Sequence, residues 1–282
     1  MVKNLKYYLL LVRPANLGII ALTQLLFMLA ATRFNFLYFR LPECITVIFA
    51  VVFTAAAGNV INDIFDIEED QINKPEKRII QKHISTKNGR IFYGILVLLA
   101  IIAGFYTGWG MGFLCMAISV MLYFYSSDLK GTNLQGNLLI SFLTAAVVYT
   151  AARGVMTVAD GYFAEFSILA FCITMAREII KDCEDLEGDK AQEYETFPIV
   201  YGMRKAIWLA AAFLIVTDVL LIFLMARSGK IVFITYSTAA ILLPAAYILF
   251  RMFSAAEKKD YHSISTWLKI LMITGLCAVL FL

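Results

Sequence analysis

Long stretches without charged residues alternate with short polar segments along the chain. They cover residues 14–32, 44–62, 91–127, 132–152, 166–176, 206–226, 231–250 and 261–282, with Asp218 and Lys269 as the internal exceptions. A helix needs about 20 apolar residues to cross the ~30 Å hydrocarbon core of a bilayer. Residues 91–127 are long enough for two helices that turn at Gly108 to Gly110, and residues 154–181 predict one helix with a polar start. The pattern therefore predicts nine membrane-spanning helices.

The composition supports a membrane protein. Of the 282 residues, 61% are hydrophobic, and the mean hydropathy is +0.78, whereas soluble domains are roughly 45–50% apolar. Transmembrane barrels would show segments of about ten residues with alternating polarity. The unbroken runs of Leu, Ile, Ala and Phe favour helices instead, so we expect an all-α, polytopic membrane protein.

The basic residues predict the orientation in the membrane. If the N-terminus is cytoplasmic, only five of the 24 Lys and Arg residues fall on the outer side: Arg33, Arg40, Arg153, Arg227 and Lys230. The other nineteen lie on or next to the cytoplasmic side, as the positive-inside rule requires. The net charge of +3 suits an anionic membrane surface. It gives no indication of nucleic-acid binding, and no obligate protein partner is evident in the sequence.

Acidic residues gather in two windows that each follow an apolar stretch. Fourteen of the 21 Asp and Glu residues lie in residues 63–76 and 178–195. Each window has Asp at relative positions 0, 3 and 7, and the two sets are 119 residues apart: Asp63, Asp66 and Asp70, then Asp182, Asp185 and Asp189. This register indicates an internal repeat. Positions i, i+3 and i+7 share one face of a continuous helix, so we expect a stripe of carboxylates in each copy.

Three carboxylates on one stripe repel one another, and a bound cation would neutralise this repulsion. Mg²⁺ takes a few carboxylate ligands and completes its octahedron with substrate phosphate and water. Lys and Arg flank both clusters, so the expected ligand is a diphosphate. A His-rich zinc or iron site is excluded because His83 and His262 are the only histidines. The polar segments 71–88 and 190–204, which follow the clusters, are long enough to suggest that they cap the site.

Several motifs together resemble one family. They are Asn59-x-x-Asn62-Asp63-x-x-Asp66-x-x-x-Asp70-x-x-Asn73, Tyr125-Ser126-x-x-Leu129-Lys130, Gly136-Asn137, Arg177-Glu178-x-x-Lys181-Asp182-x-x-Asp185-x-x-x-Asp189, and Arg13-Pro14-x-Asn16 near the start. The set is similar to the UbiA superfamily of intramembrane prenyltransferases over nearly the whole chain. Within it, the run from Arg177 to Asp189 most resembles the geranylgeranylglycerol-phosphate geranylgeranyltransferases of ether-lipid synthesis.

The resemblance implies a single domain over residues 1–282, with nine helices around a central cavity and the Asp motifs, 62–70 and 181–189, at its cytoplasmic end. Two Mg²⁺ ions would be held on a prenyl diphosphate by the residues that match the family's metal ligands: Asn62, Asp66, Asp185 and Asp189. The other motif carboxylates would act as indirect ligands, through water or through neighbouring residues: Asp63, Asp70 and Asp182.

The basic residues suggest a mechanism, but the sequence does not decide which of two neighbouring residues binds the diphosphate. Mg²⁺ and basic side chains would neutralise the leaving diphosphate, so that the allylic C–O bond ionises. The candidates are Lys77 or Arg78, Lys130 and Lys181. Segment 73–78 departs from the family pattern, with Lys77 at the usual Arg position and Arg78 in place of Pro, and either residue is a candidate for the diphosphate.

Three functions compete at this point. The first is transfer of a prenyl group, most simply geranylgeranyl, to a lipid acceptor such as geranylgeranylglyceryl phosphate. The second is prenylation of an aromatic ring in quinone synthesis. The third is cation transport through the carboxylates, but transporters place ionisable groups near the bilayer midplane in broken helices. Clusters at helix ends, beside Lys and Arg, favour the anionic substrate of a prenyltransferase.

Overall fold

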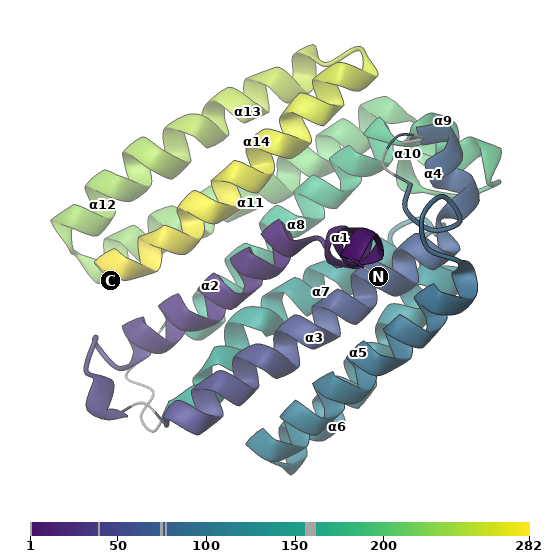
Figure 1. Cartoon of the computed structure of the whole chain (residues 1–282). Coiled ribbons are helices and arrows are strands. Elements are labelled where there is room, and N and C mark those ends of the chain that lie inside the picture. Colours follow the sequence, from purple (N-terminus) through teal and green to yellow (C-terminus); the bar gives the residue numbers. More distant parts are fainter. Residues whose placement is uncertain (1, 39, 74–75, 77, 156–161) are drawn as a thin grey trace. The chain divides into compact units, whose positions relative to one another are not determined.

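The computed structural model describes the whole chain except residues 1, 39, 74–75, 77 and 156–161 (Figure 1). Its regular structure is helical throughout the described part. The chain forms two compact units, residues 1–130 with 150–159, and residues 131–149 with 160–282. The first unit contains α1 (Val2–Leu11), α2 (Pro14–Ala31), η1 (Phe36–Tyr38), α3 (Leu41–Phe65), α4 (Ile67–Asn73), α5 (Thr86–Thr107), α6 (Trp109–Phe124), η2 (Tyr125–Leu129) and η3 (Ala151–Gly154).

The second unit holds the remaining helices. They are α7 (Gln135–Thr150), α8 (Phe163–Glu184), α9 (Leu186–Ala191), α10 (Phe197–Tyr201), α11 (Met203–Ser228), α12 (Ile231–Ser237), η4 (Thr238–Leu242), α13 (Leu243–Ser254), α14 (Lys258–Cys277) and η5 (Ala278–Phe281). Within this unit, α8 packs against α11 and α14, and α13 packs against α14. The helix that carries the second Asp cluster is thus enclosed by apolar helices.

Eight helical segments of the described chain are long and apolar enough to cross a membrane. They are Pro14–Ala31, Leu41–Phe65, Thr86–Thr107, Trp109–Leu129, Gln135–Gly154, Met203–Ser228, Ile231–Ser254 and Lys258–Phe281. The predicted turn is present, because α5 ends before Gly108 and α6 begins at Trp109. The remaining helix, α8, begins at Phe163 and not at Gly154 as the pattern suggested, and its six charged residues set it apart from the others.

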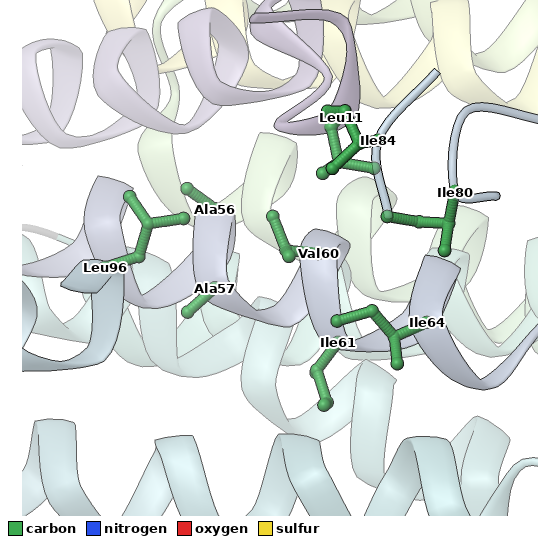
Figure 2. Close-up of a cluster of buried hydrophobic side chains, with 9 residues drawn as sticks. All are labelled: Leu11, Ala56, Ala57, Val60, Ile61, Ile64, Ile80, Ile84 and Leu96. Carbon is green, nitrogen blue, oxygen red and sulfur yellow. The ribbon is translucent and has the colours of Figure 1, made fainter. Parts of the chain in front are cut away.

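The core of the first unit forms around α3. Ala56, Val60 and Ile64 on this helix are buried together with Leu11 of α1 and Leu96 of α5 (Figure 2). Two further members, Ile80 and Ile84, come from the polar segment that follows the first Asp cluster. This part of the segment is therefore anchored by apolar side chains.

The internal repeat extends beyond the Asp motifs. A shift of 119 residues moves Pro14–Ala31 onto residues 133–150, where α7 lies, and Leu41–Phe65 onto residues 160–184, where α8 lies. The same shift carries α4 onto α9 and α5 onto α11. In each unit, the helix that bears the cluster packs against the helix that follows the polar segment. The repeat expected from the carboxylates is thus a repeat of helices.

Small residues bring α5 and α6 close together. A Cβ atom on Gly104 would lie 3.0 Å from the Met111 carbonyl oxygen and 3.1 Å from the Gly112 Cα. Both neighbours are backbone atoms, so they cannot move aside independently of the helix. Close backbone approach at small residues is a common way for membrane helices to associate.

We expect Gly104→Leu to separate α5 from α6 and to destabilise the first unit by about 1–3 kcal/mol, the usual cost of overpacking. The matched control is Gly94→Leu on the same helix, because a Cβ at Gly94 meets nothing within 4 Å. Thermal melting of the detergent-purified variants measures the effect. Equal melting temperatures for the two variants would contradict this account of the α5–α6 contact.

Candidate active site

Each Asp cluster lies at a break between two helices. Asp66 separates α3 from α4 with φ −80° and ψ 10°, and Asp185 separates α8 from α9 with φ −92° and ψ 9°. Each N–H still donates to the carbonyl four residues earlier, at 2.9 Å for Asp66 and 2.8 Å for Asp185. The two copies of the repeat therefore share the same local backbone.

The break corrects the expectation of one continuous helix through each cluster. Asp63 lies on α3 and Asp70 on α4, and Asp182 and Asp189 are divided in the same way between α8 and α9. The carboxylates thus come from the end of a long helix and from the short helix that follows it, and not from a single stripe. No Gly or Pro marks either break, which is why the spacing alone did not reveal it.

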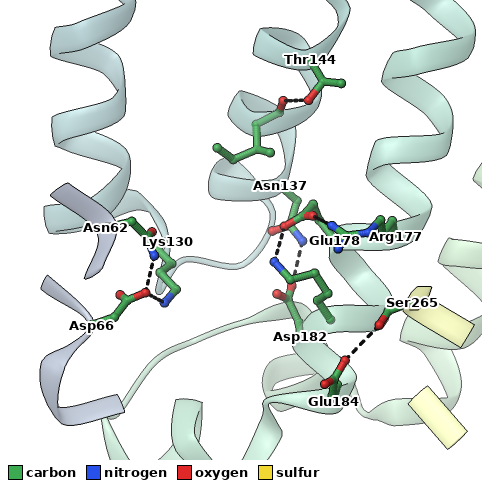
Figure 3. A network of polar contacts seen from close by, with 12 residues as sticks. Asn62, Asp66, Lys130, Asn137, Thr144, Arg177, Glu178, Asp182, Glu184 and Ser265 are labelled. Atoms are coloured by element: carbon green, nitrogen blue, oxygen red, sulfur yellow. Dashed lines mark hydrogen bonds and ion pairs between the residues drawn. The ribbon is translucent and has the colours of Figure 1, made fainter. Parts of the chain in front are cut away.

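Lys130 compensates the buried carboxylates of the first cluster. Its Nζ lies 2.6 Å from Asp66 Oδ2 (Figure 3) and 2.5 Å from Glu69 Oε2. Asn62 donates its side-chain N–H to the same Asp66 oxygen. The second oxygen of Asp66, Oδ1, is buried and has no hydrogen-bond partner. A buried carboxylate oxygen left open in this way fits the coordination of a hard cation.

The charge of Lys130 is stabilised by its surroundings. Burial opposes that charge, but the neighbouring carboxylates of Asp66 and Glu69 outweigh it and hold the pKa of the Lys130 ammonium above its usual value. Lys130 therefore stays protonated at physiological pH. The sequence motifs include Lys130 but not Glu69, which is only 4% exposed.

The first Asp of the cluster is held by the start of the chain. Asp63 Oδ1 accepts a bond of 2.5 Å from Arg13 Nη2. Arg13 connects α1 to α2 in a left-handed conformation, with φ 55°, which is uncommon for a residue with a side chain. Of the carboxylates proposed for metal binding, Asp63 is thus already engaged in an ion pair.

The second unit holds its first Asp by a different partner. Asp182 Oδ2 accepts a bond of 2.8 Å from the side-chain N–H of Asn137, on α7 (Figure 3). Asp189 accepts a bond of 3.2 Å from the Thr196 hydroxyl, just before α10. Asp185 and Asp189 are both buried. The segment after the second cluster is therefore attached to the cluster itself.

Two further groups surround this cluster. One turn before Asp182, the buried Glu178 accepts from Arg177 Nη1 at 2.6 Å and from Lys181 Nζ at 2.9 Å. Next to Asp185, Glu184 contacts two residues at the start of α14: its Oε1 lies 2.7 Å from His262 Nδ1, and its Oε2 accepts from the Ser265 hydroxyl at 3.1 Å. The sequence did not predict the contacts of Glu184, because they join residues that are far apart in the chain.

The remaining predicted residues are less tightly placed. Arg78 donates to the side chain of Gln71 at 3.1 Å, which holds it beside α4. Lys77 lies outside the described residues, so the choice between Lys77 and Arg78 stays open. In the described chain, no three His, Cys, Asp or Glu side chains are gathered closely enough to hold a metal by themselves. A Mg²⁺ ion at this site would need oxygens from the substrate and from water to complete its coordination.

Comparison with known proteins identifies the family. The family model described as the UbiA prenyltransferase family matches residues 18–273. The chain belongs to this family of prenyltransferases. UbiA-family relatives include the digeranylgeranylglyceryl phosphate synthases of Methanothermobacter thermautotrophicus, 38% identical over 75% of this chain and 72% of that protein, and of Methanopyrus kandleri, 33% identical over 98% of both.

Solved structures of the family share the fold. A structure of digeranylgeranylglyceryl phosphate synthase in membranes matches with a TM-score of 0.74 and 25% identity, over 99% of this chain and 100% of that one. A UbiA homolog from Archaeoglobus fulgidus, bound to GPP and Mg²⁺, matches with a TM-score of 0.67 and 16% identity, over 97% and 99%. The predicted family, its prenyltransferase activity and its membrane location are thereby confirmed.

We expect Lys130→Ala to lower both stability and turnover, because it leaves the carboxylates of Asp66 and Glu69 buried without their cation. Breaking a buried ion pair costs about 3 kcal/mol or more. The control is Lys259→Ala, since Lys259 forms an exposed pair with Glu257 that contributes little. Melting temperature without Mg²⁺, and turnover with it, measure the two effects. Equal losses in both variants would remove Lys130 from the site.

Proposed function

We propose that this UbiA-family enzyme transfers a geranylgeranyl group from its diphosphate to geranylgeranylglyceryl phosphate in ether-lipid synthesis. The observation that carries the proposal is the repeated helix break, which gives each unit a set of buried carboxylates beside a lysine. The names of the relatives point to the same acceptor, since the chain covers 98% of the Methanopyrus kandleri synthase. No feature of the described residues favours an aromatic acceptor.

The carboxylates and the amide of the two motifs are the proposed Mg²⁺ ligands. In the first unit they are Asn62 and Asp66, with Asp70 beside them, and in the second they are Asp185 and Asp189. Asp63 and Asp182 are already held by Arg13 and Asn137, so their role is to fix the cluster helices. When bound, Mg²⁺ supplies charge that neutralises the diphosphate oxygens.

The basic residues then bind and activate the leaving group. Lys130 and Lys181 donate to the diphosphate, together with Lys77 or Arg78. The C–O bond between prenyl carbon C1 and the diphosphate breaks, and both electrons leave with the diphosphate. The free hydroxyl oxygen of the glycerol acceptor bonds to C1, and its proton passes to an oxygen of the released diphosphate. The apolar helices exclude water, which would otherwise capture the allylic cation.

The membrane arrangement is part of the proposal. We propose α8 as the ninth membrane span, with its charged residues directed to protein surroundings, because ionisable groups at membrane depth are costly and usually functional. The N-terminus is cytoplasmic and the site opens towards the cytoplasm, in accord with the bias of Lys and Arg. The polar segments after the clusters cap the site on that side.

We expect Asp66→Asn and Asp185→Asn to abolish Mg²⁺-dependent diphosphate release while the proteins still insert and purify. Each change removes a ligand charge but keeps the side-chain size. Glu187→Gln is the control, because Glu187 lies between Asp185 and Asp189 in the sequence but is exposed. Diphosphate is measured after removal of divalent cations with EDTA and again after Mg²⁺ is restored. Full activity in both Asp variants would refute the metal assignment.

The acceptor is tested directly with purified protein, Mg²⁺ and geranylgeranyl diphosphate. We expect mass spectrometry to show a glycerol phosphate with two geranylgeranyl groups when geranylgeranylglyceryl phosphate is supplied. The comparison acceptors are 4-hydroxybenzoate and a hydroxynaphthoate. A prenylated ring would assign the enzyme to quinone synthesis, and an absence of transfer to every acceptor would contradict the proposed function.

A further inference from the structure

A polar stripe on α8 continues from the second Asp cluster towards the middle of the helix. It consists of Thr174, Arg177, Glu178 and Lys181, which are spaced at one, three and four residues. Side chains three and four residues apart are neighbours on a helix surface. Thr174 and Glu178 are buried, and Arg177 and Lys181 are partly buried. The proposed Mg²⁺ ligands do not include any of these residues, so the stripe has room for another role.

The Thr174 hydroxyl has an unusual environment. The side chain is 3% exposed, and its Oγ1 has no hydrogen-bond partner. A buried Thr in a helix ordinarily donates to the carbonyl four residues earlier. Nine other threonines of the described chain do so: Thr23, Thr32, Thr46, Thr54, Thr107, Thr144, Thr217, Thr238 and Thr266. At Thr174 a buried hydroxyl is left open for a ligand.

Arg177 also keeps unused donors. Its Nη1 donates to Glu178 Oε1 at 2.6 Å, but its Nε is buried without a hydrogen-bond partner. A guanidinium has five N–H donors in a fixed planar arrangement that matches phosphate oxygens. Glu178 holds Lys181 through its other oxygen, at 2.9 Å. Both cations are thus fixed by one buried carboxylate and retain donors for an anion.

We propose that Thr174 and Arg177 bind the phosphomonoester of the lipid acceptor. This inference rests on the proposed function and assigns the acceptor's phosphate to residues of α8. Glu178 is a positioning residue, since it holds Arg177 and Lys181 in place without contacting the substrate. Lys181, which is nearer to the Asp cluster, serves the diphosphate of the donor. An aromatic acid has no such phosphate, so the site would distinguish the two acceptor classes.

The order of residues along α8 matches the order of groups in the reaction. Lys181 precedes Asp185 by four residues, or about 6 Å at 1.5 Å per residue, and Arg177 precedes it by eight residues, or about 12 Å. The acceptor hydroxyl must lie between its own phosphate and the donor's diphosphate. Its oxygen approaches prenyl carbon C1 to roughly 3 Å before reaction. Arg177, about two turns before Asp185, is therefore at a suitable distance to bind the acceptor's phosphate while the acceptor's hydroxyl faces the donor.

The test compares a phosphorylated acceptor with its dephosphorylated form. Wild type, Arg177→Gln and Thr174→Val are assayed with geranylgeranylglyceryl phosphate and with geranylgeranylglycerol, and the KM of geranylgeranyl diphosphate is measured in parallel. We expect Arg177→Gln to raise the KM of the phosphorylated acceptor about 10- to 100-fold, as for a lost charge-assisted hydrogen bond. The KM values of the donor and of the dephosphorylated acceptor should stay within about twofold of wild type.

Further variants separate binding from folding. Arg251→Gln is the matched control, because Arg251 pairs with Asp260 outside the stripe, and it should change none of the KM values. Arg177→Lys should restore part of the affinity through its charge. If Arg177→Gln fails to fold, Thr174→Val decides, because Val has nearly the shape of Thr and lacks only the hydroxyl. It should raise the KM of the phosphorylated acceptor several-fold.

The experiment distinguishes a wrong assignment of the acceptor's phosphate from a wrong assignment of the transferase function. Equal KM increases for both acceptors, or an increase for the donor alone, would overturn the phosphate assignment while the transferase activity stands. An unchanged KM for the phosphorylated acceptor in Arg177→Gln and in Thr174→Val would overturn it as well. If the wild type transfers no prenyl group to any glycerol acceptor, the proposed function fails and this assignment falls with it.

Discussion

Burial of carboxylates at the ends of apolar helices is the constraint on which the site depends. Asp66 and Glu69 are each 4% exposed, and an isolated charge in that position would cost several kcal/mol. The first unit meets this cost with Lys130, which reaches both carboxylates from the residue after η2. The chain must therefore bring α3, α4 and the end of η2 together before any substrate binds. The packing of these helices and the pairing of the buried charges therefore depend on each other.

The second unit meets the same constraint with other residues. Its first Asp is held by the amide of Asn137, where the first unit uses the guanidinium of Arg13. Its buried Glu178 is neutralised by two cations of the same helix. The helix breaks are alike in the two copies, whereas the partners of the carboxylates differ. The two units thus share the same backbone at the cluster but use different side chains to neutralise or bind the carboxylates.

Much of this could be predicted from the sequence, because the governing patterns are local. Apolar stretches identify the eight helices of the described chain that are long and apolar enough to cross a membrane, and Gly108 marks the turn between two of them. The offset of 119 residues relates the helices of the two units. The break at Asp66 could not be predicted, because its backbone keeps the helical hydrogen bond to Asn62 and no Gly or Pro lies there. The roles of Glu69 and Glu178 were also missed. Their burial depends on packing between segments, and spacing along the chain does not encode it.

The anchoring of the segment after the first cluster limits how far that segment can move. Ile80 and Ile84 are 1% and 3% exposed, and His83 stacks on Tyr7 of α1 with ring centroids 3.8 Å apart. Residues 80–84 are therefore packed against α1 through buried apolar side chains and one pair of stacked rings. Any movement of this segment away from α1 would have to expose Ile80 and Ile84 and break the stack of His83 on Tyr7, so displacing it carries a cost in buried apolar area.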